Sequence, residues 1–276
     1  MAEGARSPGG PLASLVVVEM AGLGPAPLAC LILREMGARI IRIERPDNAR
    51  AFLSASPELD LDRHGREILT VDLKKPAGRD LVVAIAARAD LLVEGFRPGV
   101  MERLGLGPDD LTAANPRLVY GRMTGFGQHG PLAARAGHDL TYLALTGALA
   151  AIGPPDKPMP PLNLVADYGG GSMFLVAGLL AALVERSLSG RGQVVDAAMV
   201  DGASMLAAPF FAFMKSGFWT TERAGNLLDG GAPFYDVYRA ASGGHVAVAC
   251  LEPQFFAEFC RLLPLGEPYA SRQYDR

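Results

Sequence analysis

Short hydrophobic stretches alternate along much of the chain with longer segments of helical periodicity. Residues 14–19 and 38–44 are rich in Val and Ile, as buried strands are, and an apolar helix ending near Met36 separates them. The alternation continues with an extended stretch at 69–73 and a helical segment at 77–88. A further extended stretch at 89–94, a short helix and a strand at 117–122 follow. Strands that alternate with helices predict an α/β fold with a doubly wound, mostly parallel, Rossmann-like sheet.

The pattern changes toward the C-terminus. Residues 172–187 are apolar almost all round, which predicts a buried helix, and a strand at 193–198 and a helix at 202–213 follow. Residues 234–240 and 245–250 alternate around Ser242-Gly243-Gly244, which is typical of a β-hairpin. We therefore predict a large α/β domain over residues 1–215, a linker at 216–229 and the start of a smaller α+β domain at 230–276.

Composition narrows the classes of function. The chain has 276 residues, a formal charge of −3 and dispersed Lys and Arg, so nucleic acid is not an expected partner. Cys30, Cys250 and Cys260 lack the spacing of a disulfide framework or a zinc site, which favours a reducing, cytoplasmic location. The longest apolar run, 173–184, is shorter than the roughly 20 residues of a membrane span, so we expect no membrane partner.

Two segments carry an imidazole and a carboxylate. His138 follows a glycine and precedes an apolar run, and Asp167 precedes Gly169-Gly170-Gly171 and a helix. Two different bases can remove and return a proton on opposite faces of a carbon beside a carbonyl, which is racemase or epimerase chemistry. The alternatives are a structural histidine and an ordinary helix-start acid. The glycines favour a ligand close to the main chain, where N–H groups could receive an enolate oxygen.

Other motifs are less specific. Gly22 and Gly24 after the first strand, with Glu44 beyond, imitate a dinucleotide fingerprint, but Pro27 occupies the third glycine position. Six basic residues lie near predicted strand ends, where α/β sheets bind ligands, and together they suggest a phosphorylated carrier. They are Arg42, Arg45, Lys74, Lys75, Arg97 and Arg103. For any one of them alone, a solvated surface charge is the better explanation. We expect no metal site.

Four motifs match a known family. They are residues 137–142 (Gly-His-Asp-Leu-Thr-Tyr), 163–173, 230–235 and 251–255. On these motifs the chain resembles the α-methylacyl-CoA racemases, a branch of the family III CoA-transferases. The resemblance implies an acyl-CoA substrate, no separate cofactor because CoA is part of the substrate, and a homodimer shaped like interlocked rings. Members of the family usually continue beyond residue 276, so the resemblance implies a shortened small domain.

The resemblance also implies roles for particular residues. His138 and Asp167 resemble the two bases, and Glu252 resembles the partner that orients and charges His138. Alternatively, Glu252 is an exposed carboxylate at a strand end. The positions that resemble the CoA contacts of the family are Arg45, Val71, Asp72, Leu73, Lys74, Gly95, Phe96, Arg97, Arg103, Gly137, Asp139 and Tyr142. Residues 51–66 are additional to the family pattern.

Two other functions compete with racemisation of 2-methylacyl-CoA thioesters. In a CoA-transferase an aspartate at position 167 would act as a nucleophile, a reaction in which His138 has no necessary task. A CoA-binding protein without catalytic activity is the third possibility.

Overall fold

The computed structural model describes residues 9–46, 61 and 63–275. The chain forms two compact units, Met1–Thr146 with Leu162–Leu206, and Gly147–Pro161 with Ala207–Arg276. The predicted boundary at residue 215 thus lies beyond the structural one, and residues 147–161 belong with the C-terminal part. Helix α7 (Met199–Lys215) begins in the first unit and ends in the second.

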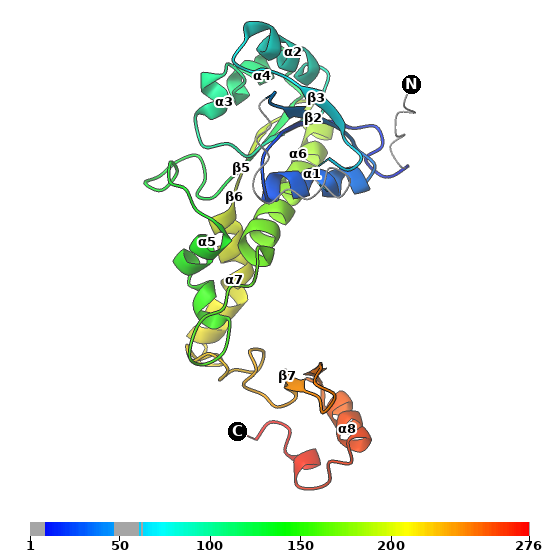
Figure 1. Ribbon diagram of the computed structural model, residues 1–276, viewed down its shortest axis with the longest axis vertical. Coiled ribbons are helices and arrows are strands. Elements are labelled where there is room, and N and C mark those ends of the chain that lie inside the picture. The colour runs from blue at the N-terminus through cyan, green and yellow to red at the C-terminus, as the bar shows by residue number, and fades with distance from the viewer. Residues whose placement is uncertain (1–8, 47–60, 62, 276) are drawn as a thin grey trace. The chain divides into compact units, whose positions relative to one another are not determined.

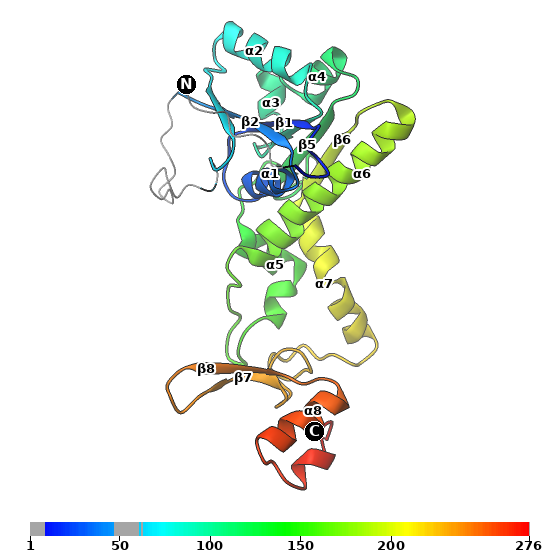
Figure 2. The same cartoon turned by 90° about the vertical axis from the view of Figure 1, so that its right-hand side faces the viewer.

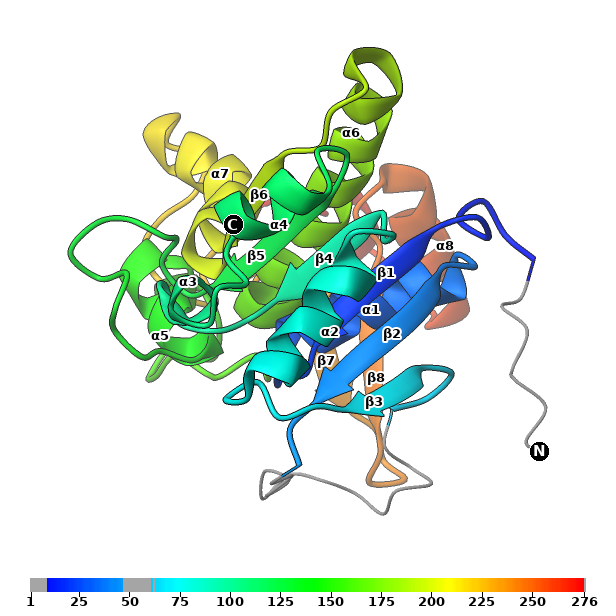
Figure 3. The ribbon, with the colours of Figure 1, turned by 90° about the horizontal axis from the view of Figure 1, so that it is seen from above.

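The first unit contains a parallel sheet in the order β3-β2-β1-β4-β5-β6 (Figure 3). This order reverses between β1 and β4, which is the point where open α/β sheets bind ligands. The strands are β1 (Val16–Met20), β2 (Arg39–Glu44), β3 (Glu67–Thr70), β4 (Leu91–Glu94), β5 (Val119–Thr124) and β6 (Val194–Ala198). The predicted α/β class and parallel sheet are confirmed.

Helices cover both faces of this sheet. Figure 2 shows one helix layer with α2, α3 and α4 and another with α1 and α6. Their bounds are α1 (Pro25–Glu35), α2 (Pro76–Ala86), α3 (Val100–Arg103), α4 (Pro108–Ala114) and α6 (Phe174–Ser189). Helix α5 (Asp139–Thr146) and a π-helical segment η3 (Leu164–Met173), which continues directly into α6, complete the unit.

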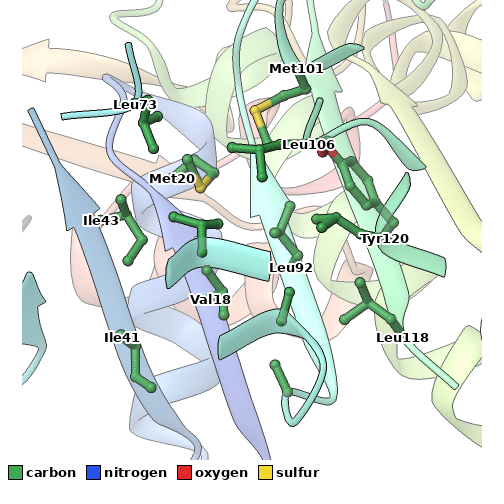
Figure 4. Close-up of a cluster of buried hydrophobic side chains, with 14 of the residues drawn as sticks. Val18, Met20, Ile41, Ile43, Leu73, Leu92, Met101, Leu106, Leu118 and Tyr120 are labelled. Carbon is green, nitrogen blue, oxygen red and sulfur yellow. The ribbon is translucent and has the colours of Figure 1, made fainter. Parts of the chain in front are cut away.

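Alternating strand residues supply the core. Val18 and Met20 of β1 and Ile41 and Ile43 of β2 point to the α2 side, together with Leu92 and Tyr120 (Figure 4). Intervening residues such as Val17, Ile40 and Leu91 are also buried, so strands of this sheet carry apolar side chains on both faces. This explains why these strands appear as continuous hydrophobic runs in the sequence.

The strand predicted at 69–73 is shifted. The structure has β3 at Glu67–Thr70, and Val71 and Leu73 lie after it with their side chains in the core. Of the additional segment 51–66, residues 61 and 63–66 are described. Arg66 within it is buried, and it donates to Glu19 and to the carbonyl of Pro27 at 2.5 and 2.6 Å. The end of the additional segment is therefore anchored to β1 and α1.

The helix over Leu164–Ser189 is long and apolar enough to cross a membrane, judged by length and composition. Its packing gives another reason for this apolarity, since Leu175 and Leu179 are fully buried and contact the backbone position of Gly121 in β5. The absence of a membrane partner therefore stays a prediction.

The second unit contains the predicted hairpin. Strands β7 (Tyr235–Arg239) and β8 (His245–Ala249) pair antiparallel with Tyr235 opposite Ala249, and Figure 1 shows helix α8 beyond this hairpin. The unit also has η2 (Ala148–Ala151), α8 (Pro253–Leu262) and η4 (Tyr269–Ser271).

The sequence predicted a linker at residues 216–229, but the structure shows a folded loop there. Asn226 is buried, and its amide donates to the carbonyls of Thr220 and Glu222 and to Asp229. Trp219 is buried against Phe210. Polar turn residues suggested a linker, but here their side chains satisfy backbone groups of a folded loop.

Candidate active site

Helix α5 and the segment η3 pack against each other in the first unit and bring the two predicted bases together. His138 precedes α5, and its carbonyl accepts hydrogen bonds from Thr141 and Tyr142 at 2.7 and 3.2 Å. Asp167 lies in the first turns of η3. The imidazole is exposed and the carboxyl group of Asp167 is buried. Of the two predicted bases, one thus lies at the surface and the other in a less polar environment.

Asp139 connects these two segments. Its Oδ2 accepts hydrogen bonds from the backbone N–H groups of Ala166 and Asp167 at 2.7 and 2.8 Å. The first N–H groups of a helix have no partner within the helix, and a carboxylate is a favourable acceptor for them. Asp167 thus lies in the first turn of η3, as a helix-start acid does, but Asp139 is the acid that accepts these two N–H groups.

The environment of Asp167 suits a base. Burial raises the pKa of its carboxyl group, and the nearby charge of Asp139 raises it further. A 2.7 Å hydrogen bond from the Asn163 amide and the positive charge of His138 act in the opposite direction. Asp167 therefore has a raised pKa and lies within electrostatic reach of His138.

The glycines after Asp167 contact protein rather than open space. A Cβ at Gly170 would lie 2.6 Å from the backbone nitrogen of Ala203, and one at Gly171 would lie 2.9 Å from the Met199 side chain. The N–H groups of Ala166 and Asp167 are already bonded to Asp139. The expectation that these glycines admit a ligand and that N–H groups there receive an enolate oxygen is not supported. Close packing against α7 explains the glycines.

Tyr142 and Gly137 are also engaged within the protein. The Tyr142 ring is buried and packs edge-on to Phe126, with 5.1 Å between ring centroids. A Cβ at Gly137 would lie 2.6 Å from this ring, and one at Gly125 would lie 2.4 Å from its hydroxyl. Burial raises the pKa of Tyr142 to about 12. These glycines let Tyr142 pack beside His138, and ligand contacts there stay a prediction.

Most of the predicted CoA contacts lie at the carboxyl ends of β2, β3 and β4. Arg45 follows β2, Lys74 lies beyond β3, and Gly95 and Arg97 follow β4. These four residues are exposed, as is Arg103 at the end of α3. Carboxyl ends of parallel strands meet at one edge of the sheet. Arg45, Lys74 and Arg97 thus lie at the edge of the sheet where α/β folds bind ligands.

Other predicted contacts face the protein. The side chains of Val71 and Leu73 are in the core, and Phe96 packs against the same core. Asp72 is half-buried, and its Oδ1 accepts a 3.0 Å hydrogen bond from the N–H of Lys74. A ligand at these positions would meet mainly backbone.

Arg42 does not belong with the basic residues that are available to a ligand at the strand ends. It is buried, and it pairs with Glu19 and, at 3.0 Å, with Glu44. Glu44 also pairs with Arg63 at 3.2 Å. Because Glu44 is buried in these ion pairs, it has no free carboxylate for a ribose. The dinucleotide fingerprint is therefore not supported.

Comparisons with known proteins identify the family of this chain. The model of CoA-transferase family III matches residues 12–276. The chain belongs to CoA-transferase family III. It is 46% identical to the α-methylacyl-CoA racemase of Mus musculus over 242 residues, which are 87% of this chain and 61% of the relative. With that of Homo sapiens it shares 44% identity, over 89% of this chain and 63% of the relative.

Solved structures of the family have the same fold. A CAIB/BAIF family protein from Brucella suis superposes with a TM-score of 0.78 at 29% identity, over 94% of this chain and 71% of the other. Rv3272 from Mycobacterium tuberculosis superposes with a TM-score of 0.74 at 31% identity, over 93% and 69%. The chain spans about three fifths of the length of the two racemases named above.

Glu252 lies in the second unit of this family III chain. It precedes α8, where its carbonyl accepts hydrogen bonds from Phe255 and Phe256 at 3.0 Å each. Its side chain is exposed. The pairing of Glu252 with His138 stays a prediction.

Sequence reasoning missed two roles in the site. The amide of Asn163, one helical turn before Asp167, donates a hydrogen bond to the Asp167 carboxylate. The spacing of four residues in the sequence was the available signal for this contact. Asp139 was assigned to the ligand, whereas its side chain faces η3. In the described part of the chain, no three His, Cys, Asp or Glu side chains lie close enough together to hold a metal ion.

Proposed function

We propose that this family III chain carries the active site of a 2-methylacyl-CoA racemase. The observation that supports the proposal most is that His138 and Asp167, two side chains of different chemistry from separate segments, lie within electrostatic reach of each other. A second base has a clear task when a proton must leave one face of a carbon and return to the other.

The reaction is an exchange of one proton. One base takes the α-proton of the thioester, and the electron pair of the C–H bond moves into an enolate. The conjugate acid of the other base then donates a proton to the opposite face, so the composition of the substrate is unchanged. The raised pKa of Asp167 makes it a stronger base than an ordinary aspartate.

Arg45, Lys74, Arg97 and Arg103 would hold the phosphates of CoA. They are exposed, and three of them follow strands at the carboxyl edge of the sheet. Guanidinium groups bind phosphate in a bidentate manner, and lysine adds a mobile positive charge. In this proposal CoA arrives as part of the substrate and no separate cofactor takes part.

We also propose that the protein is a cytoplasmic homodimer. All three cysteines are free thiols, which suits a reducing compartment. In the hairpin of the second unit, Val237 is 60% exposed, Val246 52% and Tyr238 42%. Such exposed apolar surface favours burial by another chain.

Exchange with solvent tests the reaction. Each epimer of a 2-methylacyl-CoA is incubated in D₂O, and α-deuterium and the other epimer are measured over time. We expect both to form, with His138→Ala and Asp167→Asn slowing exchange from opposite epimers by about a hundredfold or more. The matched control is His129→Ala, an exposed loop histidine, which should leave the rate unchanged. Absence of exchange from both epimers by the complete protein would refute the proposal.

The carrier site has its own test. Arg97→Gln should weaken CoA binding in a calorimetric titration, with the loss decreasing as salt rises. The matched control is Arg88→Gln, since Arg88 is exposed and precedes β4, at the opposite edge of the sheet. Equal affinities for the two variants would place CoA elsewhere.

A CoA-transferase is the second candidate. Similar relatives include the acetyl-CoA:oxalate CoA-transferase of Acetobacter aceti, 33% identical over 94% of this chain and 68% of its own length. In that reaction the Asp167 carboxylate would attack the thioester carbonyl, form a mixed anhydride and release the CoA thiolate. An acyl or CoA adduct trapped on Asp167 would favour it over the racemase, and CoA binding without turnover would favour a CoA-binding protein.

A further inference from the structure

Asp139 is a buried carboxylate in direct contact with the main chain that carries Asp167. We propose that Asp139 is a positioning residue, whose side chain fixes the first turn of η3 and thereby the carboxylate of Asp167 beside His138. This inference rests on the function proposed above, since it assigns Asp167 the role of a base.

The geometry supports a positioning role in two ways. One oxygen of Asp139 accepts both N–H groups, at 2.7 Å from Ala166 and 2.8 Å from Asp167. Asp139 is also the first residue of α5 and the neighbour of His138. One side chain therefore couples the main chain of one base to that of the other, and a shift of either segment changes both.

The side chain of Asp139 has little room for any other task. It is 3% exposed, so a ligand cannot surround its carboxylate. Its second oxygen, Oδ1, is buried and accepts no hydrogen bond from the described residues. A buried acceptor without a partner is costly, and such groups persist where they serve a site. Here the carboxylate of Asp139 places negative charge close to Asp167.

This charge acts on the second base. Asp139 raises the pKa of Asp167, in addition to the larger effect of burial. Of the other groups near Asp167, His138 lowers its pKa by charge and Asn163 lowers it by a hydrogen bond, whereas Tyr142 is itself influenced by both aspartates. Among described residues, α1, α6, α7, β5 and β6 also pack close to η3, and none of them adds a charged group that acts on Asp167.

Two substitutions separate position from charge. Asp139→Asn keeps an oxygen that can accept the N–H groups and removes the charge, whereas Asp139→Ala removes both. The matched control is Asp110→Asn, because the Asp110 carboxylate accepts the N–H of Gly107 at the start of α4, away from the bases. Three measurements are made on each variant: the ¹³C titration of the Asp167 carboxyl, the pH profile of α-proton exchange and the thermal unfolding temperature.

We expect Asp139→Asn to lower the pKa of Asp167 and to move the ascending limb of the pH profile to lower pH. Asp139→Ala should reduce the exchange rate about a hundredfold, with the KM for acyl-CoA within about twofold, because the base is misplaced and the carrier site is intact. Asp110→Asn should change neither the titration nor the rate.

Three outcomes would overturn the inference. They are an unchanged Asp167 titration and pH profile in Asp139→Asn, a normal exchange rate in Asp139→Ala, and equal effects of Asp139→Asn and Asp110→Asn. If Asp139→Ala does not fold, the Asp139→Asn data decide alone. If the wild-type protein exchanges no proton, the proposed function fails, and the carboxyl titration still decides whether Asp139 acts on Asp167.

Discussion

The contact between Gly170 of η3 and Gly202 of α7 provides a sharp test of the packing that holds Asp167. A Cβ at Gly202 would lie 1.9 Å from the carbonyl oxygen of Gly170 and 2.6 Å from its carbonyl carbon. Carbon atoms in normal contact are about 3.5–4.0 Å apart. Because both contacts are with backbone, no side-chain rotation relieves them, and Gly202→Ala must move the two segments apart.

The magnitude follows from two opposing effects. Overpacking of a close contact costs about 1–3 kcal/mol, and a backbone clash belongs at the upper end of this range. Alanine in a helix is about 1 kcal/mol more favourable than glycine. We therefore expect Gly202→Ala to lower the free energy of unfolding by about 2 kcal/mol, or the Tm by about 5 °C.

The assay compares unfolding with catalysis. Thermal unfolding is followed for the wild type, Gly202→Ala and Met205→Ala, since Met205 lies on the same helix with 62% of its surface exposed. Met205→Ala should stay within about 0.5 kcal/mol of the wild type. Gly202→Ala should also slow α-proton exchange, because Gly170 is three residues from Asp167. A Tm for Gly202→Ala equal to or above that of the wild type would refute the argument that close packing requires these glycines.

Three further predictions concern buried polar groups. Arg66→Met leaves buried Glu19 with one ion-pair partner fewer and should cost about 3 kcal/mol in urea unfolding. The exposed pair of Arg39 with Glu67 gives the control Arg39→Met, expected below about 1 kcal/mol, and equal losses would contradict the reasoning. Asn226→Ala removes the partner of the Thr220 N–H and of three acceptors, so hydrogen exchange should accelerate across residues 216–229, and unchanged protection would show that the loop holds without it. Burial raises the pKa of Asp167, so its ionisation favours the unfolded chain, and stability from this group is lost as pH rises from the ordinary aspartate pKa through the raised one. Asp167→Asn should therefore match or exceed the wild-type Tm at pH 8 while losing activity, and a larger deficit at pH 8 than at pH 4 would disprove this sign.

Local sequence patterns were sufficient to predict most helices and strands of the first unit. β1, β2 and β4 are rich in Val, Ile and Leu, and helices follow β1, β3 and β4, so the α/β class could be predicted. The hairpin of β7 and β8 was also predicted, because alternation around a glycine turn is a local signal. Boundaries were less exact, as at β3, where Val71 and Leu73 extend the hydrophobic pattern although they lie beyond the strand.

The unit boundary could not be predicted in the same way. Residues 147–161 join the C-terminal part because Arg223 donates to the carbonyls of Ala150, Pro154 and Pro155. Such a contact between residues far apart in the chain has no local sequence pattern. Asn226 likewise belongs to a turn-rich stretch that resembled a linker, and only its burial reveals a folded loop.

For the site, the sequence by itself determined which residues are candidates for the chemistry. Asp167, His138 and the basic residues after the strands were found from residue type, motif and place relative to predicted elements, because these depend on neighbours in the chain. Tertiary structure alone decided what surrounds them. It buried Arg42 and Glu44 in ion pairs, packed Gly170 against α7 and turned the side chain of Asp139 toward η3. Burial and pKa depend on groups that come together from distant segments of the chain. Local patterns in the amino-acid sequence do not show which distant segments become neighbours.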